Sequence, residues 1–377
     1  MHRETEAPGM LARKFLDGLA VPLMGVAAIC CMGQAAMAAQ TRTFVIAWFV
    51  QAASSKDGDC PDGLNPLPED MFRTELKGIG LTPEKIEEIL GDLKGGSSGP
   101  VTRSALINRG RIDGKPVNAY TYPTSVPDVG FHEVKSQYAY GFNLDGNQGT
   151  GGFEDPDTHE KGVDNQYWRA MGCNINHRGS PREVPTEWAL HWDNERDKMP
   201  AWLMSITAED FSKDGDVSVN FNKALEHVSR DAAGYVRTDS TFRIDPDPRW
   251  QNTLHGKLKD GEISITEPGN VHLSGDPYGI TELDMSNAHL RLKLNADGTA
   301  EGVLGGYIPW RRVFFVYGSS GYSEETMIGT DIPGVYYALR HHADAYPDPK
   351  TGENTAISTA WRVVAVPAYH VSLQAEK

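Results

Sequence analysis

A series of short extended runs in the second half of the chain constrains the fold most. From about Ala201 onward, such runs alternate with turn signals: AWLMSITAED, VSVNFNKAL, STFRIDPD, GEISITEP, HLRLKLNADG and EGVLGGYIPW. In one of them, Leu290 and Leu292 alternate with Arg291 and Lys293, which gives one buried face and one wet face. Antiparallel strands at this spacing predict a mainly β protein, either a β-sandwich or a barrel, with a few short helices.

The chain before these runs divides into two sections. Residues 39–100 are predicted to hold an N-terminal strand, RTFVIAWFV, and a helical section, TPEKIEEILGDLKGG, which Thr82 can cap. The GGSSGP that follows is the best candidate for a linker. Residues 101–200 are predicted to be a loop-rich region with an acidic block. Residues 201–377 are the β-rich domain, in which DIPGVYYALRHHADAYPDP predicts one late helix.

The first 38 residues have the pattern of a secretory signal peptide. Arg13 and Lys14 form a basic start, LAVPLMGVAAICCMG an apolar core, and AMA at 36–38 a small-x-small cleavage site. The apolar run is short for a bilayer span, so an uncleaved anchor is the weaker alternative. No later stretch is apolar enough to cross a membrane. We therefore expect a periplasmic or extracellular protein with no membrane span after cleavage.

Two cysteines remain after residues 1–38 are removed, Cys60 and Cys173. In an oxidising compartment an even pair indicates a disulfide. The alternative is two free buried thiols.

The net charge of −15 limits the possible partners. An acidic surface repels phosphate backbones, and no basic stripe in the sequence offsets it. We therefore expect no nucleic-acid binding.

One stretch is too polar to fold by burying apolar surface. GFNLDGNQGTGGFEDPDTHEKGVDNQ, at 141–166, is rich in Gly, Asp and Asn. Calcium takes six to eight oxygen ligands from carboxylates, amides and carbonyls on a chain that can turn sharply. Closely spaced carboxylates repel one another unless a cation lies among them. The sequence therefore predicts a calcium site, with the candidate ligands Asp145, Asn147, Asp155, Asp157, Asp164 and Asn165.

Two alternatives to calcium stay open for this acidic block. Asp and Asn side chains can bond their own backbone in a solvated loop, without any ion. Asp-x-Asp carboxylates can also serve as the acid and base of an enzyme. The pattern departs from the EF-hand loop because His159 replaces the third Asp and no Glu closes the frame.

Other chemical signals in the sequence are weak. His341 and His342 are adjacent on the predicted late helix, so their side chains diverge and cannot easily share a metal. The YGSSGYS around Ser319 and Ser320 lacks the GxSxG spacing of a hydrolase elbow. Several tryptophans in the β-rich region could bind a sugar or an apolar ligand if exposed, although burial in the core is the better expectation.

Three blocks of sequence carry a resemblance to other proteins. GFNLDG…GVDNQYWRAMGC, GVYYALRHHADAYPDPKTGENTAIS and CPDGLNP are similar to a group of exported bacterial proteins, and the similarity covers most of the chain after the signal. The resemblance implies no activity. It implies that the acidic block and both cysteines belong to one structural plan.

These observations predict an exported, calcium-stabilised, β-rich binding or accessory protein, whose ligand is a small molecule, a glycan or a protein. The alternative is a secreted hydrolase that depends on carboxylates or a metal, and a purely structural role is a third reading. Whether the protein is an enzyme stays open. Carboxylates that face a pocket would favour the hydrolase.

Overall fold

The computed structural model describes most of the chain after the predicted signal peptide. None of its described helices is long and apolar enough to cross a membrane. The signal peptide and most of the linker candidate lie outside the described residues, which are 39–94, 99–149, 151–178, 196–275 and 282–372.

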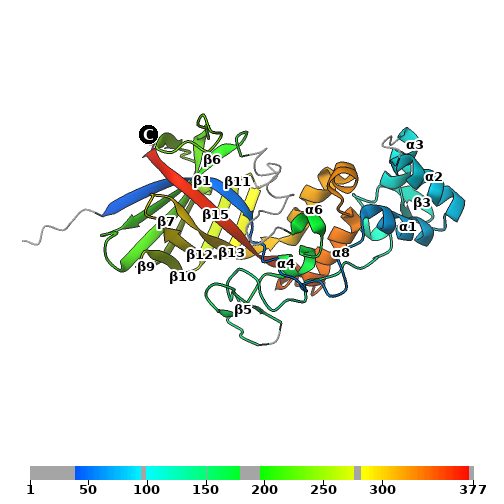
Figure 1. The fold of residues 1–377 in the computed structure, drawn as a ribbon, viewed down its shortest axis with the longest axis horizontal. Coiled ribbons are helices and arrows are strands. Elements are labelled where there is room, and N and C mark those ends of the chain that lie inside the picture. The colour runs from blue at the N-terminus through cyan, green and yellow to red at the C-terminus, as the bar shows by residue number, and fades with distance from the viewer. Residues whose placement is uncertain (1–38, 95–98, 150, 179–195, 276–281, 373–377) are drawn as a thin grey trace, which may run out of the picture. The chain divides into compact units, whose positions relative to one another are not determined.

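Eight antiparallel strands of the described chain form a closed barrel (Figure 1). Each strand pairs with the next, and the last pairs again with the first, so the predicted sandwich or barrel is a barrel. Closure satisfies the backbone groups that an open sheet would leave at its edges. In ring order the strands are β1 (Gln40–Gln51), β6 (Pro200–Ala208), β7 (Gly215–His227), β9 (Gln251–Lys259), β10 (Glu262–Glu267), β12 (Glu282–Leu294), β13 (Ala300–Pro309) and β15 (Asn354–Ser372).

Side chains along the barrel strands alternate between the interior and the outer surface. In β9, Leu254 and Leu258 are buried while Thr253 and Lys257 are exposed, which is the period of two that a half-buried strand requires. The buried sides of the strands meet in one apolar core. The alternation predicted at Leu290 is observed, and β12 pairs antiparallel with β13, the next strand of the chain.

Short strands add to the outside of the barrel. β8 (Ser240–Ile244) pairs in parallel with β15, and its Phe242 packs with outward-facing apolar side chains of β1 and β6 in a second, smaller core. β11 (Gly269–Ser274) pairs with β12, and β14 (Ala345–Pro347) pairs with the start of β15. A 3₁₀ turn, η3 (Pro248–Trp250), leads into β9.

Three helices pack at the end of the barrel where β13 stops and β15 starts (Figure 1). They are α4 (Gln166–Met171), α6 (Trp310–Ser319) and α8 (Ile332–His342), and their apolar faces join the barrel core. α8 is the predicted late helix. The side chain of Asp331 caps it by accepting from the backbone N–H of Gly334. Between α6 and α8 lie α7 (Gly321–Ser323) and the π-helical turn η4 (Glu324–Ile328).

A bundle of three short helices follows β1. It consists of α1 (Pro68–Gly78), α2 (Pro83–Lys94) and α3 (Pro100–Ile107), which share a small core that includes Leu76 and Leu90. α2 is the helix that the sequence predicts, and the Thr82 hydroxyl accepts from the backbone N–H of Lys85 as expected. α1 and α3 were not predicted.

Where the structure describes it, the region predicted to be rich in loops has short elements after α3, in addition to α4. It contains β2 (Gly110–Ile112), β3 (Lys115–Val117), η1 (Pro123–Ser125), β4 (Phe153–Glu154), β5 (Lys161–Val163) and η2 (Ile175–His177).

The predicted disulfide is present. Cys60 and Cys173 are bonded, with their Cα atoms 5.9 Å apart, and they join the segment after β1 to the end of α4. A small core around Trp168 packs against the bond and holds the base of the acidic block.

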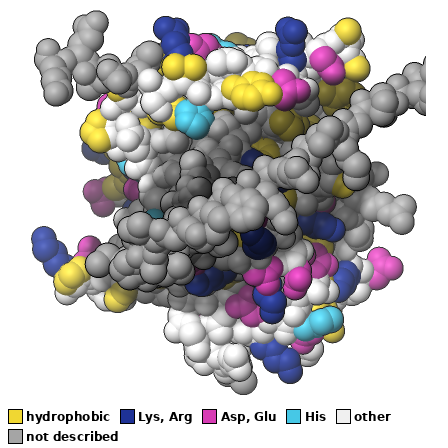
Figure 2. Space-filling view, turned by 90° about the vertical axis from the view of Figure 1, so that its left-hand side faces the viewer, with side chains coloured by type: hydrophobic (Ala, Val, Ile, Leu, Met, Phe, Trp, Pro, Cys, Tyr) yellow, Lys and Arg dark blue, Asp and Glu magenta, His cyan; other side chains and the backbone are white. Residues whose placement is uncertain are grey.

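Charges of both signs are mixed on one described face of the molecule. In Figure 2, basic and acidic side chains lie next to one another on the described part of the face shown. The net negative charge is therefore not gathered into one patch on that part of the face.

Candidate functional site

The acidic block is built from turns that its own Asp and Asn side chains close. Asp155 Oδ1 accepts from the backbone N–H groups of Asp157 and Thr158, each at 3.0 Å. Asp145 accepts in the same way from the N–H of Asn147, at 2.7 Å. Such local bonds explain how a stretch with so few apolar residues can hold a defined shape.

An arginine from the barrel lies at the centre of this block. Arg291 points outward from β12, and its Nη2 donates to Asp155 Oδ2 at 2.6 Å and to the carbonyl of Gly141 at 3.3 Å. Its Nη1 lies 3.2 Å from Glu160 Oε2. Because Asp155 is fully buried, its charge needs a partner, and the guanidinium supplies one. The cation expected among the carboxylates is thus, for Asp155 and Glu160, an arginine.

An aromatic ring fixes the same contact. Phe142 lies under the Arg291 guanidinium, 4.7 Å from ring centroid to Cζ, and stacks on His289. A Cβ on Gly305 would come within 2.7 Å of the Phe142 ring, so the absence of a side chain there lets the block approach the barrel.

The other predicted calcium ligands have separate structural roles. Asp164 Oδ2 accepts from the N–H of Leu144 at 2.7 Å, and burial, together with the nearby Asp145 and Asp344, raises the pKa of Asp164 to about 6. Asn165 caps α4 and donates to the carbonyl of Tyr140.

The six candidate ligands are therefore spread over several turns rather than gathered in one cage. Among the described residues, no group of three or more His, Cys, Asp and Glu side chains is arranged to hold a metal ion. Calcium binding stays a prediction from the sequence.

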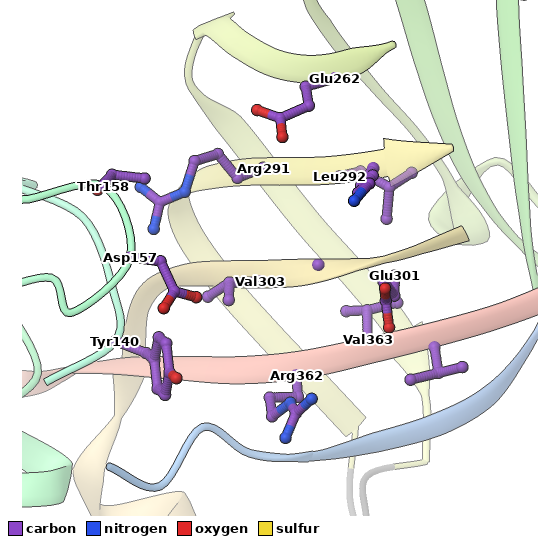
Figure 3. A pocket seen from close by; sticks show the side chains of 13 residues that line it. Tyr140, Asp157, Thr158, Glu262, Arg291, Leu292, Glu301, Val303, Arg362 and Val363 are labelled. Atoms are coloured by element: carbon purple, nitrogen blue, oxygen red, sulfur yellow. The ribbon is translucent and has the colours of Figure 1, made fainter. Parts of the chain in front are cut away.

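A pocket of about 320 Å³ lies between the block and the outer wall of the barrel (Figure 3). Its volume is at the low end of the range for small-molecule sites. The block contributes Asp157 and Thr158, and Tyr140, the residue just before the block, lies on the same side. The barrel contributes outward-facing side chains that include Glu262, Arg291, Lys293, Glu301, Val303 and Arg362.

Lys293 and Arg362 differ in their cross-strand neighbours. Lys293 lies opposite Glu262 on β10 and Glu301 on β13, so acids flank it on both sides. Arg362 lies opposite valines on β13 and β1. The Arg362 side chain has no hydrogen bond or ion pair with another described residue.

Asp157 carries the charge opposite to that of Arg362. Its carboxylate also has no ion pair or hydrogen bond with another side chain of the described chain. Tyr140 lies beside it in Figure 3. Burial raises the pKa of Tyr140, Asp157 raises it further and Arg362 lowers it, so both charges act on the same phenol. This part of the pocket therefore offers a ligand a carboxylate, a guanidinium and an aromatic hydroxyl. Neither charged group is taken up by an ion pair with another described side chain.

Sequence reasoning identified Asp157 but missed the barrel side of the pocket. The alternating pattern identifies Arg291 only as a polar residue on the solvent-facing side of a strand. An acidic block that needs a cation was a signal for some basic residue, but nothing in the sequence indicates which strand the block covers.

The weaker candidates have structural roles. His342 packs 3.0 Å from Glu133, and His341 is mostly exposed beside Asp128. Ser319 donates to the carbonyl of Val316 within its own helix. The tryptophans of the β-rich region that the structure describes are buried, as expected: Trp202, Trp250, Trp310 and Trp361.

Comparison of the chain with protein-family models, with curated proteins and with solved structures gives no match.

Proposed function

We propose that the protein is an exported binding protein that holds a small polar ligand in the pocket between the acidic block and the barrel. The observation that carries the proposal is the pair Arg362 and Asp157, which are opposite in charge, free of partners in the described chain and close to Tyr140. The disulfide and the signal-like start of the sequence support an oxidising, extracytoplasmic location.

The chemistry of the lining favours a ligand with both an anionic and a cationic group. Arg362 can pair with a carboxylate in a two-point contact, and Asp157 can accept from an ammonium. An amino acid or the end of a short peptide has both groups and is small enough for this volume. A neutral sugar could use the same donors and acceptors, but it would leave both charges without a counter-charge.

A binding screen against the purified full protein tests this proposal. Amino acids, dipeptides and monosaccharides are titrated by calorimetry, and each ligand found is repeated with Arg362→Met and Asp157→Asn. We expect a zwitterionic ligand to bind at least about tenfold more weakly to each variant, since each loses a charged contact worth about 1.5–3 kcal/mol. Arg243→Met is the matched control, because Arg243 is an exposed strand arginine outside the pocket.

The outcomes of the screen are distinct. A sugar whose affinity falls in either pocket variant supports the site but not the zwitterionic ligand. No ligand in the panel, or affinities unchanged in both variants, contradicts the proposed site.

One observation favours a hydrolase as a second candidate. The carboxylates of Asp157, Glu262 and Glu301 face the same pocket. All three are exposed, whereas a general acid is normally a carboxyl shielded from water. Incubation of each bound ligand with the protein, followed by mass spectrometry, checks this candidate. Turnover that Glu301→Gln abolishes would favour it over simple binding.

A further inference from the structure

The three-helix bundle α1–α3 meets the helices at the barrel end through a buried cluster of charges. Glu75 of α1 and Arg109, two residues after α3, contribute from the bundle side. Glu325 of η4, the α8 cap Asp331, and Tyr120 contribute from the other side. We propose that this cluster is a pH-sensitive joint, which holds the bundle in place in acid and loosens it as the pH rises.

Arg109 is the centre of the cluster. It is fully buried; its Nε donates to Glu75, and its Nη2 lies 2.6 Å from Glu325 Oε1 and 3.3 Å from Asp331 Oδ1. One guanidinium thus faces three carboxyl groups that are themselves buried. If all three were ionised, the cluster would carry two uncompensated negative charges away from water, which is costly.

The three carboxyl groups are not equally well satisfied. Glu325 accepts from Arg109 at both oxygens, from the Tyr120 hydroxyl at 2.6 Å and from the backbone N–H of Ile332. Asp331 accepts from Arg109 and from the N–H of Gly334. Glu75 accepts only from Arg109, and its buried Oε1 has no hydrogen-bond partner in the described chain.

Glu75, the least satisfied of the three, is therefore one of the groups that keep a proton. Burial raises its pKa to about 7; Arg109 opposes this increase and the charge of Glu325 adds to it. Burial, together with the charges of Glu75 and Glu325, also raises the pKa of Asp331 well above its ordinary value, so Asp331 too holds a proton in the closed joint. The charged and titratable groups that face Glu75 are Arg109, Glu325 and Asp331, with Tyr337 of α8 close enough to sense its charge.

The direction of the pH effect follows from these protonation states. Glutamate released into water has a pKa near 4.5, whereas the closed joint holds the Glu75 proton up to about pH 7. Between these values the closed state binds more protons than the open one, so closure weakens as the pH rises. Above about pH 7 Glu75 is ionised in both states and its contribution levels off, while the proton on Asp331 acts in the same direction.

Hydrogen exchange of the full protein tests the joint. We expect the equilibrium constant for opening the bundle, read from the slow amides of α1 and α3, to increase on the order of 50-fold between about pH 5 and about pH 8. Amides of the barrel serve as the internal reference, because a change in pH alters the intrinsic exchange rate of bundle amides and barrel amides equally. Glu75→Gln should keep the bundle closed and clearly reduce this increase, since a neutral amide cannot ionise and no longer raises the pKa of Asp331.

A matched variant shows whether the pH dependence comes from the buried carboxyl of Glu75 or from removal of any carboxylate of the bundle. Glu87→Gln changes an exposed glutamate on α2 of the same bundle and should leave the pH dependence intact. Because Glu75→Gln replaces a buried group, its circular dichroism and melting at about pH 5 confirm folding first. If it does not fold, direct carboxyl titration of the wild type by NMR decides. Bundle exchange that tracks barrel exchange at every pH, a pH dependence that Glu75→Gln leaves unchanged, or a Glu75 carboxyl that titrates near pH 4.5 overturns the proposal.

Discussion

Arg291 shows how one side chain can organise a segment that has little apolar surface. Its guanidinium contacts Asp155, Glu160 and the carbonyl of Gly141, so one residue of β12 holds several points of the block. The block in turn forms one wall of the pocket, so this contact also positions Tyr140 and Asp157.

Replacing this arginine should therefore release the block. Arg291→Met leaves the buried Asp155 carboxylate without its cation, and we expect a loss of about 3–5 kcal/mol in the free energy of unfolding. Arg291→Lys, which keeps the charge but not the fork of donors, should lose less. Denaturant titration measures both. Arg249→Met, at an exposed ion pair, is the control and should change stability by less than about 1 kcal/mol. If Arg291→Met leaves the free energy of unfolding nearly unchanged, the block is held by other contacts.

At the scale of elements, the block as a whole remains a candidate calcium loop. An ion that binds the folded block and not the unfolded chain stabilises the protein by about 2.7 kcal/mol at a free concentration of a hundred times Kd. Calcium should then raise the melting temperature and EDTA should lower it, and Asp157→Ala or Asp164→Ala should remove the difference. Differential scanning fluorimetry measures these shifts. A melting temperature that ignores both reagents, with no ion found by native mass spectrometry, leaves Arg291 as the cation of the block.

The disulfide links two elements that are 113 residues apart in sequence. By chain entropy it stabilises the fold by about 4–5 kcal/mol, chiefly by restricting the unfolded chain. Cys60→Ser with Cys173→Ser should lower the unfolding free energy by an amount of this order. Because the disulfide lies at the base of the block, amide hydrogen exchange in this double variant should increase first around Trp168. Equal denaturation midpoints with and without reductant would contradict this.

At the scale of the whole molecule, the predicted signal peptide ends close to where the described fold begins. β1 starts at Gln40, directly after the predicted cleavage site. The mature protein should therefore keep the complete first strand of the barrel. N-terminal sequencing of protein from the periplasm or medium should begin near Ala39. A product that still starts at Met1 or Met10 would remove the argument for export.

Local features could be predicted because they depend on neighbours in the sequence. The alternation around Leu290, the cap at Thr82 and the start of the late helix at Asp331 each reflect contacts within a few residues, and all three are observed. The disulfide could be predicted because only two cysteines follow the predicted signal peptide. The buried charge cluster could not, because Glu75 and Arg109 look like ordinary surface residues in the sequence.

Long-range contacts were decided only by the tertiary structure. Alternation states which side of a strand is buried but not which strand lies beside it, so the sequence left sandwich and barrel open until β1 was seen to pair with β15. Likewise, the sequence predicted that a cation lies near Asp155 but did not identify it as Arg291, which is 136 residues away. The sequence by itself determined most of the barrel strands, though not β9, together with the polar character of the block and the cysteine pair. Ring closure and the docking of the block created the pocket, because each brings together side chains that share no local pattern.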